Sequence, residues 1–230
     1  WTFNWQSVIS ELSTLSIGIE QIDSNTLVFD PGELDSGAYS VIVEASNSAL
    51  TTSVKIELHL IEAAPILSSD EDSDGDGDFD FGEGYDDSDG DGIVDYLDNI
   101  DELHLAPVNE GSSVRMQAQV GNRIKLGSVA LFNNKNVVKV SKVDLQRAGI
   151  ELDEGYSYPD GLYNFTVSGQ ASGSSYYVVL PLNIPLGEEP IFRKYMGPQK
   201  GWQDYDLNTD KLFSAAAEEG ACPEPGSVLY

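Results

Sequence analysis

The segment 70–101 is too acidic to fold compactly without a source of positive charge. It contains 15 aspartate and glutamate residues and no lysine or arginine. Like charges at this density repel one another and oppose compaction. Within it, the stretches 72–83 and 87–98 share one twelve-residue pattern, with aspartate at positions 1, 3 and 5, glycine at position 6 and carboxylates at positions 9 and 12. A bound cation can supply the missing charge, so the pattern predicts folding that is tied to a metal ion.

Carboxylates in this register predict calcium sites. Ca²⁺ takes about six to eight oxygen ligands, and alternate side chains of a curled loop can place them around one ion. The glycines at position 6, Gly77 and Gly92, allow the sharp turn because glycine adopts positive φ without steric cost. The main-chain carbonyl at position 7 adds a further oxygen. The predicted ligands are Asp72, Asp74, Asp76, Asp78, Asp80 and Glu83 in the first loop, and Asp87, Asp89, Asp91, Ile93, Asp95 and Asp98 in the second.

Two loops of this kind predict at least two calcium ions. The alternative interpretation is a disordered acidic linker, which is also the state we expect of the same segment when calcium is removed. Sites of this type suit the millimolar calcium found outside cells better than the far lower concentration of a cytosol. We therefore expect an extracellular protein.

The overall composition limits the partners. The chain has 12 basic and 39 acidic residues, for a formal net charge of −27. Such a surface repels nucleic acids and anionic membranes. No apolar run approaches the roughly 18 residues of a membrane-spanning helix, so direct membrane insertion is not expected. The sequence also lacks the His-Glu-x-x-His, Gly-x-Ser-x-Gly and P-loop motifs, and we expect a protein that is not an enzyme.

Residues 1–64 have the pattern of a β-sandwich. Residues 51–62 alternate between apolar and polar side chains, and residues 38–45 contain a second alternating row. The stretch Leu34-Asp-Ser-Gly-Ala-Tyr39-Ser-Val41 resembles the tyrosine corner of immunoglobulin-like and polycystic-kidney-disease-like domains. This resemblance implies that the Tyr39 hydroxyl bonds back to the chain and that Trp5 is the core tryptophan of a third strand. The first strands of the domain would then lie upstream of Trp1.

Residues 65–103 form the predicted connector. The run Asp-Ser-Asp-Gly-Asp-Gly-Ile-Val-Asp-Tyr-Leu-Asp-Asn at 87–99 resembles thrombospondin type 3 repeats, in which calcium rather than a hydrophobic core organises the loops. The resemblance implies a metal-stiffened connector. The flanking sequences also favour a connector, since neither loop is bordered by the amphipathic helices of a signalling EF-hand.

Residues 104–230 return to strand patterns, with one helix predicted between Lys142 and Ala148 and Ser141 as its N-cap. The stretches 161–169, 178–182 and 220–230 resemble the choice-of-anchor U domain of bacterial surface and secreted proteins. This resemblance implies a second β-sandwich. It also implies that the disulfide partner of Cys222 lies beyond Tyr230, on a segment that completes the domain.

The predicted fold class is all-β, with two β-sandwich domains joined by a loop-rich, calcium-binding connector. The predicted function is a calcium-stabilised structural or adhesive segment of a bacterial surface protein. Its expected partners are calcium and either copies of itself or other surface proteins and glycans. Two alternatives stay open: a subunit of a surface filament completed by strand addition, and an accessory module of a secreted hydrolase.

Overall fold

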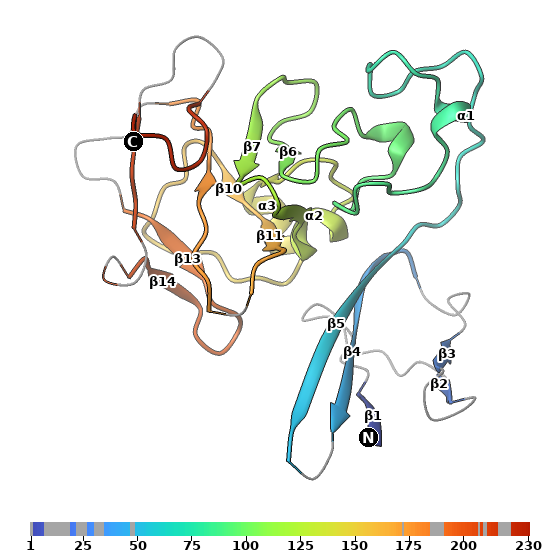
Figure 1. The fold of residues 1–230 in the computed structure, drawn as a ribbon, viewed down its shortest axis with the longest axis horizontal. Coiled ribbons are helices and arrows are strands. Elements are labelled where there is room, and N and C mark those ends of the chain that lie inside the picture. Colours follow the sequence, from blue (N-terminus) through green and yellow to red (C-terminus); the bar gives the residue numbers. More distant parts are fainter. Residues whose placement is uncertain are drawn as a thin grey trace. The chain divides into compact units, whose positions relative to one another are not determined.

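The computed structural model contains short strands in small sheets and a few short helices, in agreement with the predicted non-helical fold (Figure 1). Internal contacts divide the chain into two units, Trp1–Ile66 with Leu131–Asn134, and Leu67–Ala130 with Lys135–Tyr230. The second unit therefore includes both acidic loops. The structure describes residues 2–6, 19–21, 27–29, 35–46, 49–171, 173–184, 191–206, 208, 211–215 and 222–230.

The described part of the first unit has five strands. The antiparallel sheet β1-β4-β5 consists of Thr2–Gln6, Gly37–Ser46 and Thr51–Leu60. A separate pair joins β2 (Ile19–Gln21) to β3 (Leu27–Phe29). The two alternating stretches of the sequence thus form β4 and β5, which pair along their whole length. The backbone of Trp5 lies opposite Val43 in the sheet, but the predicted core position of its side chain lies outside what the structure describes.

The predicted hydrogen bond from the Tyr39 hydroxyl back to the chain is confirmed. Tyr39 lies near the start of β4 and its hydroxyl donates to the main-chain carbonyl of Asp35 at 2.7 Å. The side chain is buried, with 7% of its surface exposed. Burial, together with the nearby charge of Asp35, raises the pKa of Tyr39, so the neutral hydroxyl is the donor at all ordinary pH values.

Replacing Tyr39 with phenylalanine is expected to destabilise the first unit by about 1 kcal/mol, because a partly buried hydrogen bond to the Asp35 carbonyl is lost. The measurement is amide hydrogen exchange of peptides covering β4 and β5, which should exchange about fivefold faster. Tyr176→Phe, at an exposed tyrosine of the second unit, is the control. Equal exchange in wild type and Tyr39→Phe would show that the hydrogen bond contributes nothing.

The second unit is built from several two- and three-stranded antiparallel sheets. Their orders are β12-β7-β6, β11-β8, β10-β9 and β13-β14. The strands are β6 (Leu105–Pro107), β7 (Arg115–Ala118), β8 (Arg123–Leu126), β9 (Lys139–Val140), β10 (Leu162–Tyr163), β11 (Phe165–Ser168), β12 (Val178–Val179), β13 (Arg193–Tyr195) and β14 (Trp202–Asp204).

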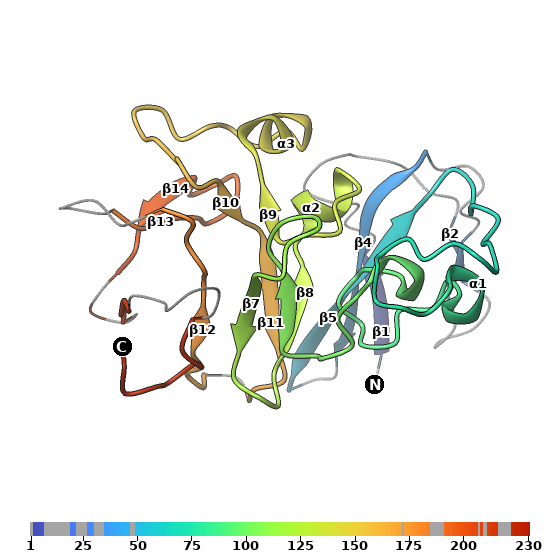
Figure 2. The ribbon, with the colours of Figure 1, turned by 90° about the horizontal axis from the view of Figure 1, so that it is seen from above.

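The helices in the described part of the chain are all short, and the one at Ser128–Phe132 ends in the segment Leu131–Asn134, which groups with the first unit. The helices are α1 (Asp80–Glu83), the 3₁₀ helix η2 (Asp95–Leu97), α2 (Ser128–Phe132) and α3 (Lys142–Arg147). Figure 2 shows β7, β8 and β11 side by side, with α2 and α3 toward one end of these strands. Within β7 and β8, burial alternates, and Met116, Ala118, Ile124 and Leu126 are the inward residues. This inner row is the part of the core that borders the second acidic loop.

Two helix starts are fixed by side chains. As predicted, Ser141 is the N-cap of α3. Its hydroxyl accepts from the Asp144 amide at 3.2 Å, and the Asp144 carboxylate accepts from the Ser141 amide at 2.8 Å. This reciprocal pair satisfies two helix-terminal donors. The N-terminal amides of Val129 and Ala130 in α2 instead donate to the side-chain oxygen of Asn164, at 3.0 and 3.1 Å.

Candidate metal centre

The two acidic loops have the same backbone geometry. Gly77 and Gly92, at position 6, have φ values of 110° and 99°. Gly75 and Gly90, at position 4, have φ values of 80° and 73°. Residues with a side chain rarely adopt such values, so the alternation of aspartate with glycine is what allows each loop to curl.

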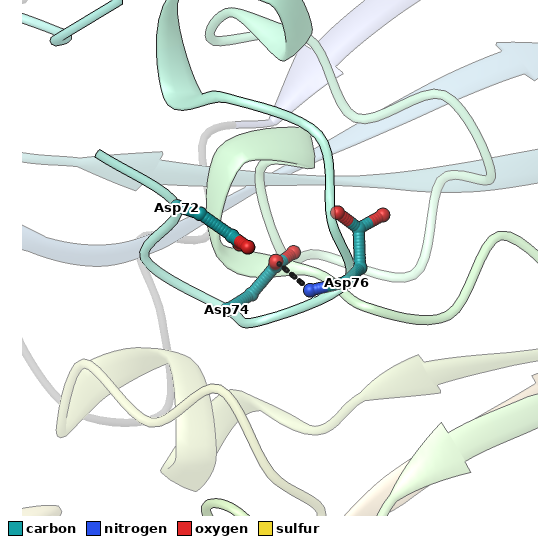
Figure 3. A group of neighbouring side chains, drawn as sticks. All are labelled: Asp72, Asp74 and Asp76. Atoms are coloured by element: carbon teal, nitrogen blue, oxygen red, sulfur yellow. Dashed lines mark hydrogen bonds between the residues drawn. The ribbon is translucent and has the colours of Figure 1, made fainter. Parts of the chain in front are cut away.

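In the first loop the curl brings three carboxylates together. Asp72, Asp74 and Asp76 place oxygen atoms within 4.8 Å of one another. Figure 3 shows Asp72 and Asp74 pointing toward each other, with Asp76 beside them. The Asp76 amide donates to Asp74 at 3.1 Å, and the Gly75 amide donates to Asp72 at 2.8 Å. These bonds to backbone amides hold the side chains at positions 1 and 3 on the inside of the loop.

The second loop repeats this arrangement in a more buried setting. Asp87, Asp89 and Asp91 also place oxygen atoms within 4.8 Å of one another. Here the Asp91 amide donates to both Asp87 and Asp89, at 3.0 and 2.9 Å. The side chains of Asp89 and Asp91 are 5% and 1% exposed. Burial of two aspartates in one loop is unusual, because charged groups seldom leave water unless they are paired.

The carboxylates at position 9, predicted as ligands, are hydrogen-bonded to the serine at position 2 of their own loop. Both oxygens of Asp80 accept from Ser73, one from its amide and one from its hydroxyl, each at 2.8 Å. Asp95 accepts from Ser88 in the same way, at 2.8 and 2.7 Å. The structure therefore directs Asp80 and Asp95 to the serine at position 2, where they close the loop. The repeated serine at position 2 was the sequence signal for this contact.

The remaining predicted ligands fall into two groups. Glu83, the last residue of α1, and Asp98, at 6% exposure, occupy position 12 of their loops. Asp98 accepts from the Ile100 amide at 3.1 Å. At position 7, the amides of Asp78 and Ile93 donate to Asp76 and Asp91 at 2.8 and 2.7 Å. Asp78 itself lies exposed, whereas the Ile93 side chain is 2% exposed and belongs to the core.

Burial and mutual repulsion raise the pKa values of the loop carboxyls. Burial first, and then the charge of Asp98, raises the pKa of Asp91 to about 8. Burial, followed by the charge of Asp89, raises the pKa of Asp98 to about 7. In the first loop, burial and neighbouring aspartates raise the pKa of Glu83 to about 7, and burial raises that of Asp74. The charged forms are therefore costly, and a cation would favour them.

Three carboxylate oxygens in the loops are buried without a hydrogen-bond partner in the described part of the chain. They belong to Asp74, Asp89 and Glu83. Buried polar oxygens nearly always have a partner, because desolvation without one costs free energy. Oxygen-only clusters are the donor sets that hard divalent cations prefer. The two aspartate trios can therefore each hold a metal ion.

The second loop is attached to the core of its unit. The Leu126 amide of β8 donates to the Asp91 carbonyl at 2.7 Å, and beyond the end of the loop the Ile124 amide donates to the Leu103 carbonyl at 2.8 Å. Ile93 and Ile100 are almost fully buried. A change in the shape of this loop therefore acts directly on β8.

The first loop has fewer such attachments in the described part of the chain. Asn99 donates from its side chain to the Asp74 carbonyl at 3.3 Å, and Arg115 donates to the Asn99 side chain at 3.2 Å. Both bonds are exposed. Two side-chain bonds of this kind hold a loop less firmly than buried backbone bonds and apolar contacts do.

Comparison of the chain with protein-family models, with curated proteins and with solved structures found no match. None of the helices in the described residues combines the length and apolar character needed to span a bilayer.

Proposed function

We propose that this protein is a calcium-stabilised, non-enzymatic structural or adhesive segment of a bacterial surface protein, and that it acts outside the cell. Calcium at the two aspartate trios would rigidify residues 65–103. The observation that carries this proposal is the second trio, in which Asp89 and Asp91 are buried and one Asp89 oxygen has no hydrogen-bond partner in the described part of the chain.

Calcium is the ion that best suits these trios. Each offers only carboxylate oxygens, and further carboxylates lie at position 12. Zinc sites usually contain histidine or cysteine, and Mg²⁺ demands a small octahedral site that keeps several waters. Calcium accepts a larger and more flexible set of oxygens, which a glycine-rich loop can supply. We propose that the two loops are calcium loops of the thrombospondin type 3 kind.

The flanking regions support a structural role. The sheet order β1-β4-β5 and the Tyr39 hydrogen bond are features expected of an immunoglobulin-like or PKD-like sandwich. We extend the proposal to a second sandwich in residues 104–230, of the choice-of-anchor U type. Domains of this size that are joined by a stiff connector can present a binding surface at a distance from a cell.

The test is calcium titration by isothermal calorimetry after the protein has been treated with EDTA. We expect about two ions per chain, and much weaker binding of magnesium because the loops lack its preferred geometry. Small-angle scattering with and without calcium then measures the shape change. A scattering profile that is the same with and without calcium, together with no heat of calcium binding, would rule the proposal out.

A further inference from the structure

A positively charged side chain from β8 lies against the second loop. Arg123, the first residue of β8, is half-buried, and its guanidinium faces Gly90. A Cβ atom added to Gly90 would lie 2.9 Å from the Arg123 Nη1 atom and 3.2 Å from Cζ. Gly90 lies between Asp89 and Asp91, two members of the trio. The guanidinium therefore lies against the backbone of the loop between two aspartates of the trio.

Arg123 forms no ion pair within the described residues, and its Nε atom is buried there without a hydrogen-bond partner. It thus acts on the loop through its charge and its packing rather than through a direct salt bridge. Burial raises the pKa of Asp89, and the positive charge of Arg123 works against that rise. The charge is held in place because Arg123 pairs with Ser168 in the β8–β11 sheet.

Among the described residues, no cation lies at the corresponding position of the first loop. Gly75, which corresponds to Gly90, has open space where its Cβ would lie. No lysine or arginine occurs anywhere in 70–101, and the charges that act on Asp74 are those of Asp76 and Asp72. The two loops thus share a sequence pattern and differ in their electrostatic surroundings.

We propose that Arg123 is a resident counter-charge that keeps the second loop folded against β8 when calcium is absent, and whose task calcium takes over. This inference rests on the proposed calcium-binding function. Without calcium, the Arg123 charge offsets part of the repulsion among the aspartates. With calcium bound, the ion neutralises them, and the same arginine becomes less important. Arg123 is thus a positioning residue and not a metal ligand.

The test measures exchange of the Leu126 amide, whose hydrogen bond to Asp91 reports opening of the loop. Arg123→Met removes the charge and keeps an apolar stem, whereas Arg123→Lys keeps the charge. In EDTA we expect Leu126 to exchange about tenfold faster in Arg123→Met than in Arg123→Lys. In saturating calcium the two variants should differ by less than about threefold, because the ion has replaced the charge.

The matched control is Lys125→Met, which removes one positive charge from the same face of β8 two residues away. It should leave the exchange of Leu126 nearly unchanged in both media. If Arg123→Met accelerates exchange equally with and without calcium, or more with calcium, Arg123 acts by packing and the inference is overturned. Where Arg123→Met does not fold in EDTA, Arg123→Gln takes its place.

Failure of the underlying function gives a different result. If the wild-type protein binds no calcium, the titration described above shows it, and the proposed function fails. The comparison of Arg123→Met with Arg123→Lys in EDTA would still decide whether the positive charge stabilises the loop. Equal exchange in those two variants would overturn the inference whatever the titration shows.

Discussion

Without calcium, the second unit should lose stability as the pH rises from about 4 to about 8. The reason is that Asp91 and Asp98 are more easily protonated in the folded chain, where burial raises their pKa values to about 8 and about 7. In the unfolded chain an aspartate titrates near pH 4. The folded state therefore binds more protons than the unfolded state throughout this range, and raising the pH favours unfolding.

The size of the effect follows from the shifts. Each pKa unit corresponds to about 1.4 kcal/mol, so the shifts of the two carboxyls together set an upper limit on the order of 10 kcal/mol to the loss across the interval. The stabilisation that comes from protonated Asp91 and Asp98 is fully present below the pKa of an aspartate in the unfolded chain. It disappears as the pH rises above the pKa values of these two carboxyls in the folded chain. This trend is the opposite of ordinary acid denaturation, in which paired carboxylates destabilise the protein when they become protonated.

Urea unfolding in EDTA at a series of pH values measures this trend. The same series in saturating calcium is the control. There the ion requires deprotonated carboxylates, so stability should rise with pH over the same interval. A metal-free protein that becomes more stable between pH 5 and pH 8 would contradict the assigned burial of Asp91 and Asp98.

The backbone turns and the grouping of carboxylates within each loop could be predicted from the sequence, because both depend only on the position of each residue in the loop. The glycine spacing predicted the positive φ of Gly77 and Gly92, and the alternating aspartates predicted both trios. In the same way, Ser141 just before the helical stretch predicted the start of α3. In each case the interacting groups are only a few residues apart in the chain.

The hydrogen bonds of Asp80 and Asp95 to serine were not predicted, for a different reason. A carboxylate at position 9 can reach either an ion or the serine at position 2, and counting carboxylates does not distinguish the two. The serine offers a hydroxyl and an amide seven residues earlier, and both bonds form in each loop. The repetition of Ser73 and Ser88 at the same position, read together with position 9, would have indicated it.

The difference between the loops depends on contacts that no local pattern contains. Leu126 and Arg123 reach the second loop from 35 and 33 residues beyond Asp91 and Gly90, through the folding of β8. Sequence similarity between the loops therefore suggested equal sites, whereas two members of the second aspartate trio are buried and the first trio is largely exposed. Only the three-dimensional packing of β8 reveals this asymmetry.

The most informative substitution pair is Asp89→Asn and Asp74→Asn, because both residues occupy position 3 of their loops. Each accepts a hydrogen bond from the amide at position 5, at 2.9 Å for Asp89 and 3.1 Å for Asp74. Each also has a second oxygen that is buried without a hydrogen-bond partner in the described residues. Asparagine keeps the shape and one accepting oxygen, removes the charge and places a donating amide group where the second oxygen was, and it does so equally at both positions.

In calcium, Asp89→Asn should lower the stability of the second unit by about 3 kcal/mol, the value for a hundredfold loss of affinity at saturating calcium. The same change at Asp74 should weaken its own site to a similar degree and leave β8 nearly unaffected, because the side-chain hydrogen bonds that join the first loop to the unit are exposed and its helix α1 contacts η2 of the second loop. The readouts are calorimetric titration and exchange of the Leu126 amide.

Without calcium, the effect of Asp89→Asn on the stability of the second unit should change sign. Removing a buried negative charge from a repulsive trio stabilises the loop, so Asp89→Asn should be at least as stable as the wild-type protein in EDTA. A merely structural aspartate would lose stability in both media when it is replaced. Loss of stability at Asp89 in EDTA, or an equal effect of Asp74→Asn on Leu126 in calcium, would therefore show that the two loops do not divide their roles in this way.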